Sequence, residues 1–244
     1  MRYKASVTYN GSSYHGWQTQ PDKQSIQSEI ERALSIIHKE ETSITASGRT
    51  DRNVHALNQV FHFDSDLDLK SESWVKAINT HLPKDIRIKK VIHVDEDFHA
   101  RFDATSKTYH YKLNTRAFDV FTINTITQYN QPLNLNKLKE ASTLFIGKHD
   151  FTSFNKTPLS VIEGQTRTIT TFDVLEKNGV ITFIIKGDGF LRHMIRMLVA
   201  TTIAYSEDKI TLEKIDNALK HPSKNKIKYN IEGNGLYLVC VDYD

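Results

Sequence analysis

The chain has few of the residues that mark specialised classes of protein. Its 244 residues include one cysteine, 10 glycines and 5 prolines. A single cysteine cannot form an internal disulfide, which excludes a small secreted disulfide scaffold. So little glycine and proline excludes a collagen-like or low-complexity chain. The longest apolar run, near residues 194–204, is interrupted by Arg196 and two threonines, so no segment is predicted to span a bilayer.

Signals for export, metals and cofactors are also missing. The first four residues lead straight into an alternating pattern, without the charged and apolar regions of a signal peptide. There is no P-loop, the dinucleotide fingerprint is incomplete, and the histidines lack the spacing of zinc ligands. We therefore expect a soluble, cytoplasmic protein that uses no metal and no cofactor.

The charges of the two signs nearly balance, with 32 Lys+Arg against 29 Asp+Glu and a formal net charge of +3. The excess lies in residues 101–200, which carry 13 basic and 8 acidic side chains together with many aromatic ones. Basic groups neutralise phosphates and aromatic faces stack on unpaired bases, so this composition suits an RNA partner. On composition alone, an ordinary charged surface over an aromatic core is the simpler interpretation.

Periodicity predicts an α+β fold. Alternating apolar residues indicate strands near residues 3–9, 58–63, 86–93, 107–113, 167–175, 180–186 and 235–241. Helical spacing indicates helices near residues 25–38, 72–80, 135–145, 190–205 and 211–219. A hairpin signal at residues 177–179 favours antiparallel pairing. We expect two similar halves, residues 1–105 and 106–244, each with a largely antiparallel sheet flanked by helices.

One polar loop carries the strongest chemical signal. Residues 47–56 read Ser-Gly-Arg-Thr-Asp-Arg-Asn-Val-His-Ala. Asp51 stands between Arg49 and Arg52, whose positive charges favour its ionised form. An ionised carboxylate on a loop suits a nucleophile or a general base. Most loop aspartates instead close a turn or cap a helix, so the loop alone does not decide.

The same loop resembles the G-R-T-D-A-G-V-H-A signature of the TruA family of tRNA pseudouridine synthases. Other blocks resemble that family in the same order along the chain. They are residues 9–18, 25–34, 97–102, 107–111, 149–154, 190–196 and 235–238. Together these blocks are far more specific than any one of them, because they run from end to end of the chain.

The resemblance implies an enzyme that isomerises uridine to pseudouridine in the anticodon stem-loop of tRNA, at tRNA positions 38–40. It implies a pseudouridine synthase fold with the active-site cleft between the two halves. Asp51 matches the catalytic aspartate, and Arg196 the arginine that pairs with it. Tyr109 matches the tyrosine that stacks on the target uracil. Arg49 matches the arginine implicated in displacing the target base.

The resemblance also assigns an RNA contact and an assembly state. A strip that contacts the tRNA backbone matches Phe98, His99, Ala100, Arg101 and Phe102, with Arg101 as the phosphate ligand. The family further implies a homodimer. Extrusion of a base costs a few kcal/mol, which an aromatic face and an inserted arginine would offset. Whether the aspartate adds to the ribose or the base, or removes the C2′ proton, stays open.

The chain departs from the family pattern at several positions. Arg52 and Asn53 stand in place of the usual Ala-Gly, and asparagine best tolerates the positive φ that glycine would supply. Asn10 replaces an aspartate, and Ala200 a common glycine. Three lysines (Lys224, Lys226 and Lys228) replace a stretch with proline and alanine, and they are candidate tRNA contacts.

Two other functions compete with this interpretation. A non-catalytic RNA-binding or RNA-chaperone protein would need basic groups but no special carboxylate. An aspartate-dependent glycosidase would need two partnered carboxylates, and only one stands out. The joint presence of Asp51, Tyr109 and Arg196 favours the isomerase. Without the resemblance, Tyr109 would be read as a packing residue, and that interpretation is kept for Phe151 and Phe154.

Overall fold

The computed structural model describes residues 1–244, and the chain folds as two compact units. The N-terminal unit comprises Met1–Thr105 together with Tyr237–Asp244, and the C-terminal unit comprises Ser106–Leu236. The expected ranges, 1–105 and 106–244, differ from this division in the last eight residues. These residues group with the N-terminal unit, in which the final strand pairs with β3 (His55–Asp64) at Tyr237 and Leu238.

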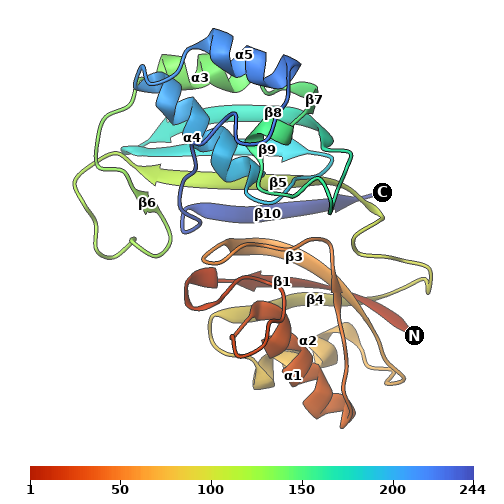
Figure 1. The fold of residues 1–244 in the computed structure, drawn as a ribbon. Helices are drawn as coiled ribbons and strands as arrows, with labels where there is room; N and C mark the ends of the chain where they lie inside the picture. Colours follow the sequence, from red (N-terminus) through yellow and green to blue (C-terminus); the bar gives the residue numbers. More distant parts are fainter. The chain divides into compact units, whose positions relative to one another are not determined.

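The N-terminal unit is built on a mixed sheet (Figure 1). Its strands are β1 (Arg2–Tyr9), β2 (Thr45–Ala46), β3 (His55–Asp64), β4 (Ile86–Val94) and β10 (Leu236–Tyr243). β1 lies between β4 and β3 and is antiparallel to both, while β10 runs parallel to β3 and β2 pairs with β3. Alternate residues of β1, from Tyr3 to Tyr9, are buried, as the sequence pattern predicts.

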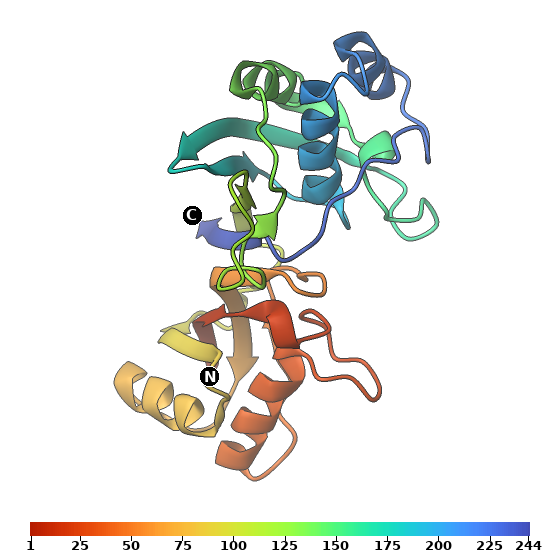
Figure 2. The same cartoon turned by 90° about the vertical axis from the view of Figure 1, so that its left-hand side faces the viewer.

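Two helices, α1 (Ile26–His38) and α2 (Ser71–His81), cover one face of this sheet (Figures 1 and 2). The N-cap of α1 is Ser25, whose hydroxyl accepts from the Ser28 amide while the Ser28 hydroxyl accepts from the Ser25 amide. Ser28 replaces the glutamate that usually completes a capping box. Trp17, Trp74 and Phe61 are fully buried in the core.

The strands of the C-terminal unit are β5 (Ala104–Asn114), β6 (Thr127–Gln128), β7 (Gly147–Asp150), β8 (Thr166–Lys177) and β9 (Val180–Gly187). They are antiparallel to one another except for the short β6, which runs parallel to β5. β9 lies between β5 and β8, and β7 pairs with the other edge of β8. The β8–β9 hairpin turns through Asn178 and Gly179, which both have positive φ, as the turn signal predicts.

The helices of this unit are α3 (Leu135–Thr143), α4 (Met194–Ser206) and α5 (Leu212–Lys220). α4 is buried on almost every side. It begins later than the predicted 190–205, because His193 adopts a left-handed φ of 61°. Phe151 and Phe154 are fully buried, as interpreted from the sequence. The α+β class is confirmed in both units. None of the helices is long and apolar enough to cross a membrane.

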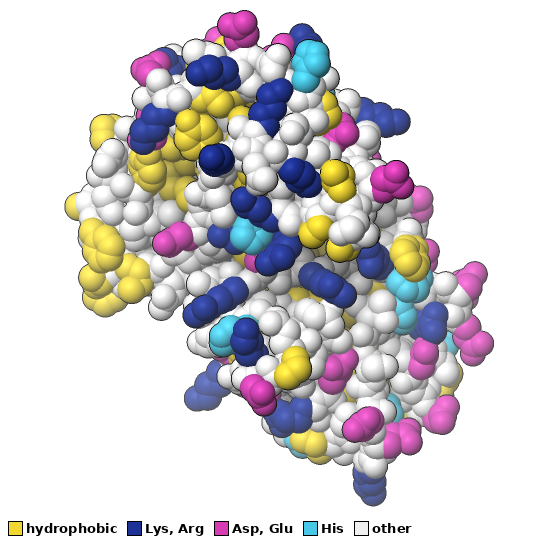
Figure 3. Space-filling model, in the orientation of Figure 1, with side chains coloured by type: hydrophobic (Ala, Val, Ile, Leu, Met, Phe, Trp, Pro, Cys, Tyr) yellow, Lys and Arg dark blue, Asp and Glu magenta, His cyan; other side chains and the backbone are white.

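An exposed apolar loop precedes β6. Phe118, Val120 and Phe121 are 62%, 60% and 95% exposed. Figure 3 shows hydrophobic side chains gathered on the side of the molecule where Figure 1 draws the β6 loop. The loop is held from within by Asp119, whose carboxylate accepts from the Phe121 amide and the Thr122 hydroxyl. Periodicity gave no indication of this surface.

Candidate active site

The aspartate loop, residues 47–54, lies directly against the turn that follows β1. A Cβ atom on Gly11 would stand 2.0 Å from the carbonyl oxygen of Val54. A Cβ on Gly16, whose φ is +93°, would stand 2.7 Å from the carbonyl oxygen of Thr50. Only glycine permits such close approach of two backbones. The two glycines of the opening block therefore give the aspartate loop its place.

Buried hydrogen bonds fix the same loop from the side of the sheet. The Thr50 hydroxyl lies 2.9 Å from the phenol oxygen of Tyr9. The Ser47 hydroxyl donates to Gln59 Oε1 at 2.7 Å, and Gln59 Nε2 donates to the carbonyl of Gly48 at 2.9 Å. Burial raises the pKa of Tyr9 and keeps its phenol protonated. Each polar group in this network is satisfied, so the network holds the loop rigidly.

Asp51 lies at the tip of the loop and is half-buried. Its carbonyl accepts from the amide of Val54 at 3.2 Å, which closes a turn over residues 51–54. Asn53 has a φ of 64°, which confirms that this position needs a residue tolerant of positive φ. Arg49 and Arg52 are exposed on either side. A carboxylate is thus presented on a hydrogen-bonded turn between two exposed cationic side chains.

A histidine that the sequence analysis gave no role supports this arrangement. His55 is buried, and its Nδ1 accepts from the amide of Gly11 at 3.1 Å. Its ring stacks on Tyr237 of β10 at 4.7 Å. The signal was present in the sequence, because Val54, His55 and Ala56 end the signature block. A motif alone does not show which atoms meet.

The predicted RNA strip, Phe98 to Phe102, lies in the connection between β4 and β5 and forms a turn there. Phe102 is 74% exposed and stacks on the ring of His99 at 4.2 Å. The guanidinium of Arg101 lies 5.8 Å from the centre of the Phe102 ring. Ala100 is fully buried and cannot contact a ligand through its side chain. Arg101 and Phe102 are therefore the strip residues most available to RNA.

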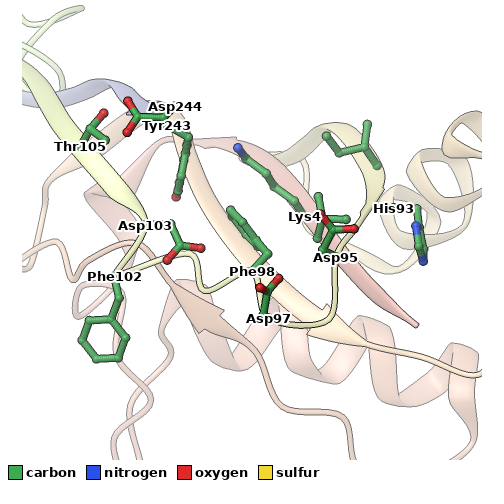
Figure 4. A pocket seen from close by; sticks show the side chains of 12 residues that line it. Lys4, His93, Asp95, Asp97, Phe98, Phe102, Asp103, Thr105, Tyr243 and Asp244 are labelled. Carbon is green, nitrogen blue, oxygen red and sulfur yellow. The ribbon is translucent and has the colours of Figure 1, made fainter.

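A surface hollow of about 680 Å³ lies beside the strip. Lys4 Nζ lies 3.5 Å from the ring centre of Tyr243 and 5.0 Å from that of Phe98, while Phe102 points away from them (Figure 4). Burial lowers the pKa of Lys4. Four aspartates also line the hollow: Asp95, Asp97, Asp103 and Asp244. Their negative charge disfavours a phosphate in this hollow.

Tyr109 lies in the C-terminal unit, near the middle of β5. It is 8% exposed and pairs in register with Ile185 of β9. The ring of Phe190 meets it edge-on, with 5.3 Å between ring centres. The strand and Phe190 fix the orientation of the tyrosine ring.

Arg196 lies in the first turn of α4 and is half-buried. Its Nε donates to the carbonyl of Ile231 at 2.6 Å, and its Nη1 lies 3.4 Å from His193 Nε2. His193 Nδ1 is in turn 3.3 Å from the side-chain nitrogen Nδ2 of Asn230. The left-handed backbone of His193 and the chain at 230–231 thus orient the guanidinium.

The two units share the predicted site residues between them. Asp51, Arg49 and the strip 98–102 belong to the N-terminal unit, whereas Tyr109 and Arg196 belong to the C-terminal unit. The structure brings Arg49 and Asp51 together on one loop. The ion pair between Asp51 and Arg196 stays a prediction.

Two of the three candidate tRNA lysines make hydrogen bonds within their own unit. Lys224 Nζ donates to Asn155 Oδ1 at 3.0 Å and to Gln165 Oε1 at 2.7 Å. Lys226 Nζ donates to two backbone carbonyls, at 3.2 and 2.9 Å. Lys228 is exposed. The sequence pattern did not indicate the structural use of Lys224 and Lys226, which leaves Lys228 as the better candidate for tRNA. No group of three or more His, Cys, Asp or Glu side chains is arranged to hold a metal ion.

The chain is similar to known proteins along its whole length. The family described as tRNA pseudouridine synthase matches residues 5–103 and 141–244. A tRNA pseudouridine synthase A of Listeria monocytogenes serotype 4b is 40% identical over 247 residues, which cover 100% of this chain and 99% of the relative. A tRNA pseudouridine synthase A 1 of Bacillus cereus is 39% identical over 245 residues, with the same coverage.

A chain of a solved Cbf5-Nop10-Gar1 complex matches much more distantly. It shares 14% identity, with a TM-score of 0.35, and the match covers 96% of this chain and 57% of that one. This likeness is too slight to support an argument. The family match and the full-length relatives are sufficient: the chain belongs to the tRNA pseudouridine synthase family.

Proposed function

We propose that this chain isomerises uridine to pseudouridine in the anticodon stem-loop of tRNA, at tRNA positions 38–40, with Asp51 as the catalytic aspartate. Family membership supports the reaction class. The structural observation that carries the assignment of Asp51 is its rigid turn, built by Gly11 and Gly16 and by buried hydrogen bonds to Thr50 and Ser47. A carboxylate that reacts with a positioned sugar or base must itself be positioned.

Tyr109, Arg196 and Arg49 complete the proposed site. Tyr109 would receive the uracil on its ring, and Phe190 already sets the orientation of that ring. Arg196, held by the Ile231 carbonyl, would pair with Asp51 and keep it ionised during the reaction. The exposed side chain of Arg49 would fill the space that the extruded base leaves.

The RNA contacts outside the reacting nucleotide are assigned to the strip 98–102. Arg101 is exposed and would neutralise a backbone phosphate. Phe102 offers a ring face beside it for an unpaired base. Phe98, His99 and Ala100 would serve this contact by shaping the turn rather than by touching the RNA.

A homodimer and a cytoplasmic location complete the proposal, and both rest on the family resemblance. The exposed apolar residues Phe118, Val120 and Phe121 are the kind of surface that protein contacts cover. The proposed reaction is an isomerisation without a redox step, so it calls for no redox cofactor.

The direct test is pseudouridine mapping in tRNA incubated with the purified protein. Transcripts with uridine at one of the three anticodon-arm positions should gain pseudouridine there. Matched transcripts with cytidine at that position should gain none. Binding of tRNA without any new pseudouridine would instead favour the non-catalytic RNA-binding function.

A further inference from the structure

The side chain of His62 binds the backbone of the strip 98–102. It lies on β3, on the opposite face of that strand from Phe61 and Phe63, and it is 7% exposed. Its Nδ1 accepts a hydrogen bond from the amide of Ala100 at 3.1 Å. A backbone amide can only donate, so this nitrogen carries no proton and the imidazole is neutral. The carbonyl of Ala100 is also engaged, accepting from the Tyr243 phenol at 2.7 Å.

His99 continues the same pattern. Its Nδ1 lies 3.1 Å from the amide nitrogen of Arg101 and 3.3 Å from that of Phe102, and it accepts from both. The rings of His62 and His99 lie 5.0 Å apart. The amides of three consecutive strip residues therefore all donate to imidazole nitrogens. This arrangement turns Arg101 and Phe102 toward solvent.

We propose that neutral His62 is a positioning residue for tRNA binding, because it fixes the turn that presents Arg101 and Phe102 to the RNA. The inference rests on the proposed function, which assigns RNA contact to this strip. Protonation of His62 at Nδ1 removes the acceptor for the Ala100 amide. A proton on this ring therefore releases the strip and weakens tRNA binding.

The charges around His62 set the direction of this dependence. Burial lowers the pKa of His62, and Arg2 on β1 and His99 on the strip lower it further. Asp64 on β3 and Asp103 after the strip act in the opposite direction. With its pKa lowered, His62 is neutral at neutral pH, and the acceptor is lost only as the pH falls through that lowered value.

The test compares His62→Asn with His62→Leu. Asparagine places Oδ1 where Nδ1 stands and cannot be protonated, whereas leucine removes the acceptor. At pH 7.5 we expect His62→Leu to raise the KM for tRNA about tenfold, with kcat within about twofold, because a buried amide is left unsatisfied. His62→Asn should keep the KM of the unmodified enzyme. His81→Asn, at the end of α2, is the matched control.

The pH dependence of the KM for tRNA distinguishes a positioning role of His62 from a contribution to folding stability alone. As the pH falls from 7.5 through the lowered pKa of His62, the KM of the unmodified enzyme should rise more than that of His62→Asn. Equal pH dependence of these two proteins would overturn the proposal, even if His62→Leu does not fold. An unchanged KM in a folded His62→Leu would also overturn it. If the unmodified protein makes no pseudouridine, the proposed function is wrong. The role of His62 is then tested by comparing the pH dependence of the tRNA dissociation constant between the unmodified protein and His62→Asn.

Discussion

At the scale of single residues, the site depends on contacts between positions far apart in the sequence. Asn53 could be given its role in advance, because positive φ is a local property that few residue types tolerate. The roles of Gly11 and Gly16 could not. Each is defined by the approach of another backbone about 40 residues later, at Val54 and Thr50.

Replacement of Gly16 by alanine tests this close approach. The added Cβ would meet the Thr50 carbonyl at 2.7 Å, on a backbone with a φ of +93°. We expect a loss of roughly 1–3 kcal/mol of stability from the strained backbone. Displacement of the aspartate loop should lower kcat by about tenfold or more. Thermal unfolding and steady-state kinetics measure the two effects.

The matched control is Gly164→Ala. A Cβ on Gly164 meets nothing within 4 Å, so this change should alter stability by less than about 0.5 kcal/mol. Normal activity and stability of Gly16→Ala would show that the glycine does not place the loop.

At the scale of elements, strong periodicity gave the correct type for most long segments, while their ends followed local chemistry. Ser25 caps the N-terminus of α1 as expected, and Ser28 rather than glutamate completes the capping box. α4 begins at Met194 and not at residue 190. The apolar pattern extends over residues 190–193, but the left-handed backbone of His193 excludes them from the helix. Short strands such as β7 are too brief to show a period.

The loop 155–165 shows how a side chain from another element fixes a connection. Lys224 Nζ donates to Asn155 and Gln165, and both of these residues are buried. We expect Lys224→Met to destabilise the protein by about 1–3 kcal/mol, because buried amide oxygens lose a charged donor. Lys228→Met, at an exposed position, should change stability by less than about 0.5 kcal/mol. Equal melting temperatures for the two variants would contradict this role.

At the scale of the whole molecule, the order of strands could not be read from the sequence. Alternation predicts which face of a strand is buried, but it does not say which strand lies next to it. The last strand, β10, runs parallel to β3 and stacks Tyr237 on His55 of the signature block. The chain therefore returns at its end to the unit that holds Asp51, which the expected division at residue 105 did not include.

The central claim is that Asp51 performs the chemistry on a tRNA uridine, and one measurement tests it most directly. Pseudouridine formation in an anticodon-arm transcript should be compared for the unmodified protein, Asp51→Asn and the exposed control Asp66→Asn. The account predicts no product with Asp51→Asn at a tRNA dissociation constant within about twofold, since one carboxylate contributes little to an interface dominated by phosphate contacts. Asp66→Asn should behave as the unmodified protein. Product formation by Asp51→Asn at the unmodified rate would contradict the account.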